Sequence, residues 1–272
     1  MVKIKDATYW AEKVRSGQIS NAELLKNTQK KLEELNPQYN AVVTYDMNQA
    51  QSDLSKTQHG YFAGIPFPLK MLGQDHTGLP STSSSKLFED SIAHSDDNFV
   101  KAALEAGLTP FGQTNSPEFG FKNITDSALY GDTCNVWNTA YYSGGSSGGA
   151  ASAVASGIFP MAGASDGGGS IRIPASFSGL IGLKMTRGLM PQGPGNYRGW
   201  QGAATTGALT VSVRDTASFV AEMQLKQEAD PYQTELLDKK TLHHLTEPDK
   251  ALNIAYSFES PVSGITLSET SK

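Results

Sequence analysis

Cysteine is almost absent from this sequence. Cys134 is the only cysteine among 272 residues, so the chain cannot form an internal disulfide, and such usage is typical of a reducing compartment. No apolar run approaches the roughly 20 residues that cross a bilayer. Residues 1–6 run directly into a polar segment without the apolar region of a signal peptide. We therefore expect a cytoplasmic protein with no membrane partner.

Positive charge is also scarce. The chain has 22 lysines and arginines against 27 aspartates and glutamates, a net charge of −5. A nucleic-acid surface needs a basic stripe, so no nucleic-acid partner is expected. The five histidines are scattered without the spacing of metal ligands, which predicts no metal site.

The composition is that of a globular protein, with 38% hydrophobic and 18% charged residues. Strand-like and helix-like segments alternate along the chain. This alternation predicts an α/β fold with a central mixed, largely parallel sheet flanked by helices. We expect one domain, with N-terminal helices over 1–60, a core over 61–220, and a helix, a loop and a last strand over 221–272.

The hydrophobic pattern places these elements more closely. The Ser20 to Glu23 spacing is a capping box that opens a helix, and this helix is expected to stop at Asn36. The other predicted helices are 6–15, 99–105, 150–155 and 212–223. The predicted strands are 41–45, 65–69, 108–112, 158–164, 178–184 and 251–256.

Glycines and serines are concentrated in the middle of the chain. Of 27 glycines, 12 lie between Gly144 and Gly188. Glycine permits positive φ and close approach of the backbone to a ligand. The cluster therefore indicates either a pocket built from backbone or a set of tight turns. Ser146 lies in Gly-Gly-Ser-Ser-Gly-Gly, and Ser170 lies in Ser-Asp-Gly-Gly-Gly-Ser-Ile-Arg-Ile-Pro-Ala.

One interpretation of this region is a nucleophile elbow. Residues 144–148 match the pattern G-x-S-x-G, which needs an acid and then a histidine further along the chain. Asp215, His243 and His244 are in that order. The two histidines lie in a polar stretch that is typical of a solvated surface, which disfavours this interpretation.

Two further patterns are weaker. The run from Gly167 to Ser170 could offer N–H groups to a phosphate, but no P-loop or dinucleotide fingerprint accompanies it. Residues 83–86 match S-x-x-K without its usual companion motifs. A surface loop is the simpler interpretation of that segment.

Several separated motifs together resemble the amidase signature family. The two serine motifs place Ser146 and Ser170 in the family's order, and Gly-Ile-Pro-Phe leads into Lys70. Further matching segments lie at 114–119, 135–138, 179–184, 186–188 and 212–217. The resemblance implies the family's α/β fold and the hydrolysis of an amide bond.

The same resemblance implies a role for each site residue. Ser170 would be the nucleophile, Ser146 a bridging serine that follows a cis peptide bond, and Lys70 the base. The backbone N–H groups of Gly167, Gly168, Gly169 and Ser170 would form the oxyanion hole. Asp166 and Arg172 would support the loop. Independently of the resemblance, the position of Asn123 after Pro117-Glu118-Phe119 is compatible with substrate binding and equally with a turn. The substrate would be a small amide, with no cofactor required and a homodimer possible.

The chain departs from the family at three points. Met71 and Met185 replace an aspartate and a proline, and family members are longer. This predicts the N-terminal catalytic portion of an amidase domain, truncated at the C-terminus. Residues 189–202 look more like stand-alone amidases, including the 6-aminohexanoate cyclic-dimer hydrolase-like branch. The alternatives are a glutaminyl-tRNA amidotransferase A-type subunit, and an inactive fragment that needs a complementary chain.

Overall fold

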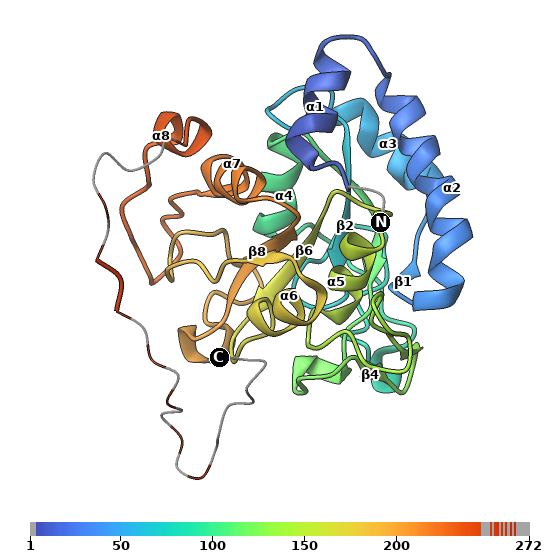
Figure 1. Cartoon of the computed structure of the whole chain (residues 1–272), viewed down its shortest axis with the longest axis vertical. Helices are drawn as coiled ribbons and strands as arrows, with labels where there is room; N and C mark the ends of the chain where they lie inside the picture. Colours follow the sequence, from blue (N-terminus) through green and yellow to red (C-terminus); the bar gives the residue numbers. More distant parts are fainter. Residues whose placement is uncertain are drawn as a thin grey trace.

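The structure is a computed structural model that describes residues 4–245 and, beyond them, residues 251, 253–255, 257, 259, 262 and 264. Helices surround the strands on several sides (Figure 1). The helices are α1 (Ala7–Arg15), α2 (Asn21–Tyr39), α3 (Met47–Lys56), α4 (Asn98–Glu105), α5 (Gly148–Ala155), α6 (Arg172–Ser178), α7 (Val213–Met223) and α8 (Lys239–His243).

The strands form separate small sheets rather than one continuous ladder. The first sheet has the order β1-β3-β2, and the second the order β6-β8-β7. A short hairpin joins β4 to β5. The strands are β1 (Val42–Thr44), β2 (Ile65–Lys70), β3 (Leu108–Thr114), β4 (Asp126–Ser127), β5 (Gly131–Asp132), β6 (Met161–Asp166), β7 (Ile181–Gly182) and β8 (Thr205–Thr210).

The pairing confirms a mixed α/β fold but corrects one detail. Strands β2 and β3 are parallel, whereas β1 pairs antiparallel with β3. Strand β8 pairs antiparallel with both of its neighbours. Among the described strand pairs only β2–β3 is parallel, so the expectation of a largely parallel sheet is wrong.

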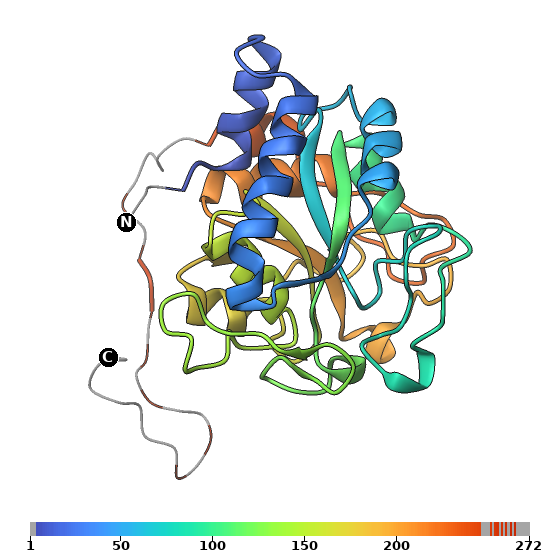
Figure 2. The same ribbon diagram turned by 90° about the vertical axis from the view of Figure 1, so that its right-hand side faces the viewer.

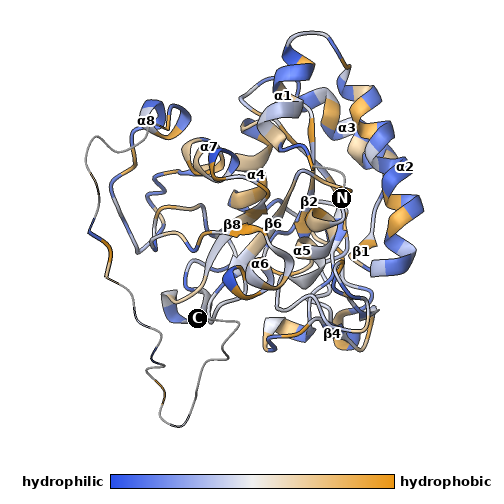
Figure 3. Cartoon of the chain, viewed as in Figure 1, coloured by the Kyte–Doolittle hydropathy of each residue, from blue (hydrophilic) through white to orange (hydrophobic). Residues whose placement is uncertain are grey.

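The core lies around β2. Every residue of this strand is buried, and the ring of Phe67 stacks against Phe219 of α7 with centroids 6.1 Å apart. Helices α1 and α2 lie beside β2 and β3 in the second view (Figure 2). Apolar colour gathers on the strands and polar colour on the outer face of α2 (Figure 3). Burying each aromatic side chain contributes about 1.5–3 kcal/mol, which fixes β2 firmly.

The start of α2 is as expected, but its end is not. Ser20 Oγ accepts from the Glu23 N–H at 3.2 Å, and the Glu23 carboxylate accepts from the Ser20 N–H at 2.9 Å. The helix continues past Asn36 to Tyr39 and includes Pro37. Proline in the last turn removes a single intrahelical hydrogen bond, and Asn40 in the left-handed conformation then ends the helix.

The first helix is fastened to α7, which is far away in sequence. The Asp215 carboxylate accepts from the Ala7 N–H at 2.6 Å and the Thr8 N–H at 2.9 Å. Asp6 receives two hydrogen bonds of 2.7 Å from the Arg214 guanidinium. Because Asp6 also caps α1, these contacts lock the beginning of the fold to α7.

Two predicted strands differ in the structure. Over 178–184, α6 ends at Ser178 and Gly179 caps it with φ +68°, so extended pairing is limited to β7. Over 251–256, the described residues have no regular structure, and Ile254 is 76% exposed; the rest of that segment lies outside the described residues. Nothing in the sequence pattern predicted α3 or β8.

Over the part of the chain described, no helix has the length and apolarity to cross a membrane.

Candidate active site

The two sheets bring the candidate catalytic residues to one cavity of about 420 Å³. Lys70 is the last residue of β2, and Ser165 lies in β6. Ser146 precedes α5, and Ser170 lies in the turn between β6 and α6. Ser146, Ser165 and Ser170 all line the cavity. Segments that are widely separated in the sequence therefore meet at the ends of buried strands.

Lys70 is the most unusual ionisable group here. It is 1% exposed, and its Nζ donates to Ser146 Oγ at 2.7 Å and to Ser165 Oγ at 3.0 Å. Burial lowers the pKa of Lys70 to about 7, opposed in part by the negative charge of Asp166. An amine with this pKa is substantially neutral near pH 7, so it can accept a proton.

Ser146 follows a cis peptide bond, as the family resemblance implied. The bond between Gly145 and Ser146 is the cis peptide. A Cβ atom on Gly145 would lie 2.7 Å from the backbone nitrogen of Ile124. Glycine is therefore required there, because the chain passes too close for any side chain.

Ser170 presents a free hydroxyl to the cavity. The residue is 8% exposed, and among the described residues its Oγ has no hydrogen-bond partner. The N–H groups of Gly167, Gly168 and Ser170 likewise make no hydrogen bond within the described part of the chain. They are available to a substrate oxygen.

Gly169 does not fit the role expected of it. Its N–H donates to Asp166 Oδ1 at 2.8 Å, so that N–H is already used. The expectation that Gly169 contributes an oxyanion donor is corrected here, because the Asp166 carboxylate folds the loop around itself. Three candidate donors remain in the turn.

Asp166 and Arg172 occupy the positions expected of loop supports. Asp166 is fully buried. It accepts from the Ile171 N–H at 3.1 Å and the Arg172 N–H at 3.3 Å. The Arg172 guanidinium adds two hydrogen bonds of 2.9 Å. These donors hold the pKa of Asp166 below its usual value despite its burial, so the carboxylate stays charged and organises the turn.

The structure does not bring Asn123 to the cavity. Asn123 is exposed, and among the described residues it is not part of the cavity wall. Its backbone instead packs beside Gly145. Nearby, Lys122 and Asp126 form an ion pair at 2.8 Å on the surface. The backbone of this loop therefore lies against the cis peptide.

The histidines of the nucleophile-elbow interpretation lie elsewhere. His243 Nε2 is 2.7 Å from Glu222, and its ring stacks on Tyr61 at 4.3 Å. Asp215 is occupied by α1. No histidine of the described chain lines the cavity, so a Ser-His-Asp arrangement around Ser146 is excluded.

Sequence reasoning missed several residues of the site. Ser165 lies within the second serine motif, but the pattern predicted no role for it, although its hydroxyl contacts Lys70. Trp200 lies against the turn formed by residues 167–170, where a Cβ atom on Gly167 would come within 2.8 Å of its ring. The ring also stacks on Phe121 with centroids 5.7 Å apart. The aromatic side chains alone gave no signal that they would meet at the site.

Several known proteins are similar to this chain in sequence or in structure. The chain is 40% identical over 252 residues to a protein named lipoamidase from Enterococcus faecalis, covering 91% of this chain and 32% of that protein. A solved structure of 6-aminohexanoate cyclic dimer hydrolase complexed with substrate matches with a TM-score of 0.86 and 36% identity, over 93% of this chain and 53% of that one. The A-type subunit of glutamyl-tRNA(Gln) amidotransferase from Thermotoga maritima matches with a TM-score of 0.66 and 28% identity, over 79% and 47% respectively.

These matches cover much more of this chain than of its relatives. The chain spans 32% to 54% of the length of curated relatives that it matches. The family model described as Amidase matches residues 23–270, which is nearly the whole sequence. The chain therefore belongs to the amidase family.

Proposed function

We propose that this chain is the catalytic portion of an amidase that hydrolyses a carbon–nitrogen amide bond through Lys70, Ser146 and Ser170. The observation that carries the proposal is the buried Lys70 amine, 2.7 Å from the Ser146 hydroxyl. Ser146 lies in the wall of a cavity that also holds Ser170. A buried lysine with a pKa of about 7 has few structural explanations, because burying its charge without an acidic partner is costly.

Acylation begins with a proton relay. Neutral Lys70 accepts the proton of Ser146, and Ser146 takes the proton of Ser170. The Ser170 Oγ then forms a bond to the amide carbon, and the carbonyl π electrons move to oxygen. The free N–H groups of Gly167, Gly168 and Ser170 stabilise that oxyanion. Each such donor is worth about 3–4 kcal/mol in the transition state.

Collapse of the intermediate completes the exchange. The carbon–nitrogen bond breaks, and its electron pair takes a proton from Ser146, which is resupplied by Lys70. The amine leaves and an ester remains on Ser170. Water then attacks the ester by the same relay, releasing the acid and restoring the Ser170 hydroxyl. Protons balance over the cycle, and no cofactor takes part.

Two further residues support this chemistry. Ser165 gives the Lys70 amine a second partner at 3.0 Å, which fixes the direction of its lone pair when neutral. Asp166 shapes the oxyanion turn through five hydrogen bonds from three residues. We assign both as positioning residues.

A stand-alone amidase is favoured over a transamidase subunit. The structural match to the cyclic-dimer hydrolase is the better one, with a TM-score of 0.86 against 0.66 and higher identity. The third alternative is a fragment that needs a complementary chain. Because the chain covers only about half of those structures, this alternative has to be tested by measuring whether the chain hydrolyses amides alone.

Covalent labelling tests the proposal. A fluorophosphonate should label the full chain, and Ser170→Ala should abolish the label. Ser146→Ala and Lys70→Ala should each slow labelling about 100-fold or more, because both relay the same proton. Ser52→Ala, an exposed serine outside the cavity, is the matched control. Labelling that persists in Ser170→Ala would overturn the assignment, and amide turnover by the isolated chain decides against the fragment alternative.

A further inference from the structure

The cavity around Ser170 carries charge of one sign. Asp75 and Asp97 both line it, and no lysine, arginine or histidine of the described chain does. Lys70 lies behind Ser146 and is hydrogen-bonded to two serines. A ligand that enters the cavity therefore meets two carboxylates and no exposed cation.

The Asp97 side chain does not cap the helix that follows it. Asp97 is the N-cap residue of α4, yet its side chain makes no capping hydrogen bond to the helix. One carboxylate oxygen instead accepts from the Asp75 N–H at 3.0 Å. Burial, with some repulsion from Asp75, raises the pKa of Asp97 to about 6. The Asp97 carboxylate therefore lines the cavity although burial there disfavours its ionised form.

Asp75 is held just as firmly. Its Oδ2 accepts from the Ser81 hydroxyl at 2.7 Å, and its carbonyl accepts from the Asp97 N–H at 2.9 Å. The two acidic residues are therefore joined by hydrogen bonds in both directions. One of these bonds joins two backbone groups, and the other holds the Asp97 side chain against the Asp75 backbone.

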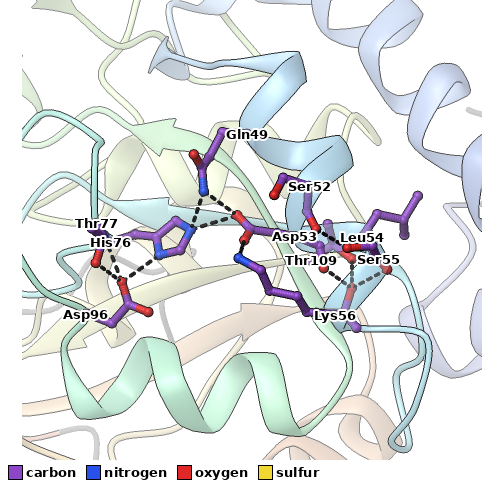
Figure 4. A network of polar contacts seen from close by, with 11 residues as sticks. Gln49, Ser52, Asp53, Leu54, Ser55, Lys56, His76, Thr77, Asp96 and Thr109 are labelled. Atoms are coloured by element: carbon purple, nitrogen blue, oxygen red, sulfur yellow. Dashed lines mark hydrogen bonds and ion pairs between the residues drawn. The ribbon is translucent and has the colours of Figure 1, made fainter.

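The charged groups of a neighbouring network are paired with one another and not with Asp75 or Asp97. His76 Nε2 lies 2.7 Å from Asp53 and Nδ1 lies 2.9 Å from Asp96 (Figure 4). Lys56 is also paired with Asp53, at 2.9 Å. These cations are matched by their own carboxylates. Lys101 is exposed on α4, and its charge lowers the pKa of Asp97 less than burial raises it.

The acidic pair lies in a cavity that already holds a reactive group. Ser170 is more than nine-tenths buried and lines the cavity, and within the described chain its hydroxyl has no hydrogen-bond partner. This hydroxyl points to a bound ligand independently of the two carboxylates. Apolar side chains supply much of the remaining wall: Leu72, Phe99, Phe119, Pro191 and Trp200. A short alkyl chain with a positive end matches this combination of surfaces.

We propose that the cavity selects amides that carry a primary ammonium group, with Asp75 and Asp97 binding the cation while Ser170 attacks the amide carbon. The proposal rests on the proposed amidase function. The two carboxylates determine specificity and take no part in the proton relay. A cation between them would offset their mutual repulsion, so binding would favour the ionised form of Asp97.

Turnover of three matched amides tests the selection. The substrates are 5-aminopentanamide, pentanamide and 4-carbamoylbutanoate, which are cationic, neutral and anionic amides of similar length. At pH 7.5 we expect kcat/KM to be about tenfold or more higher for the cationic amide than for the neutral one, and lowest for the anionic one. Asp97→Asn and Asp75→Asn should each reduce the cationic-to-neutral ratio about tenfold. Asp90→Asn, an exposed residue of the same loop, should leave the ratio unchanged.

A binding measurement separates this proposal from the amidase function. Pentylammonium should bind the Ser170→Ala chain more tightly than 1-pentanol, as followed by calorimetry, and Asp97→Asn should remove the difference. Equal binding or equal turnover of charged and neutral compounds would overturn the cation site. If pentylammonium binds selectively but no amide is turned over, the amidase function fails and the cation site stands as a binding site alone.

Discussion

The side chain of Gln74 joins Lys70 to the opposite sheet. Its Oε1 accepts from the Lys70 N–H at 2.7 Å, and its Nε2 donates to the Ala164 carbonyl of β6 at 3.0 Å. Gln74 is 1% exposed. This amide group therefore helps to hold the strand that ends at Lys70 against the strand that contains Ser165.

Gln74→Leu should loosen this connection. The substitution leaves the Lys70 N–H and the Ala164 carbonyl buried without partners, which should lower the free energy of unfolding by about 3 kcal/mol. Because Lys70 would shift relative to Ser165, kcat/KM should fall about tenfold or more. Urea denaturation and amide hydrolysis measure the two effects. Gln51→Leu on the exposed face of α3 is the control, and an equal loss in both variants would contradict the expectation.

The rate of amide hydrolysis should depend on the ionisation of Lys70. Protonated Lys70 cannot accept the proton of Ser146, so kcat/KM should rise with pH and level off above an apparent pKa of about 7. Below that value the rate should fall about tenfold per pH unit. Lys70→Met should abolish this limb and reduce the rate by about 100-fold or more. A profile that is flat between pH 5.5 and 8 in the unmodified chain would show that Lys70 is not the base.

Asp166→Asn should move that profile as well as destabilise the turn. The Asp166 charge holds the pKa of Lys70 up against the effect of burial, so its removal should shift the acid limb to lower pH. Loss of acceptors for the buried donors should cost about 3 kcal/mol of unfolding free energy. Arg172→Met should cost less, because the Arg172 side chain is 53% exposed and the backbone donors to Asp166 remain. An unshifted limb in Asp166→Asn would refute the electrostatic coupling.

His76 should contribute stability over a defined pH window. Two carboxylates outweigh burial and raise the pKa of His76 above 6.5, so its contribution is complete below pH 6.5 and is lost as pH rises through the higher folded value. The pKa values of Asp53 and Asp96 are lowered from 3.8. Their contribution is present above pH 3.8 and is lost as pH falls below it.

His76→Gln should therefore lower the unfolding free energy most between about pH 4 and pH 6.5, by about 3 kcal/mol. Thermal melting at pH 5.5 and pH 9 measures the change in this difference. His94→Gln, an exposed histidine of the same loop, supplies the comparison. A His76→Gln penalty that is larger at pH 9 than at pH 5.5 would be inconsistent with a charged imidazolium.

Sequence patterns were sufficient where chemistry requires particular residue types. Lys70, Ser146 and Ser170 each sit in a motif whose spacing is visible without a structure, and all three reach one region of the protein. The Asp166 side chain is different, because its partners depend on how the glycine turn folds. The N–H of Gly169 could point into the cavity or back to Asp166, and only the folded loop decides between them.

Two elements that the sequence pattern did not predict, β8 and α3, have similar local causes. Strand β8 reads Thr-Thr-Gly-Ala-Leu-Thr and is buried along its whole length, so it lacks the polar alternation that identifies a half-exposed strand. Helix α3 is mostly polar, with only one narrow face buried. Tertiary contacts determine both elements more than intrinsic propensity does.

The fastening of α1 to α7 has a consequence for how the chain is made. Helix α1 is synthesised before α7, and the Asp215 carboxylate that receives its leading N–H groups follows 208 residues after Ala7. Contacts this distant in sequence form late, since most of the chain must already be present. During translation, the hydrogen bonds from Ala7 and Thr8 to Asp215 therefore cannot form until α7 has left the exit tunnel, and before that α1 has its contacts with β2 and with the Tyr61 carbonyl to hold it.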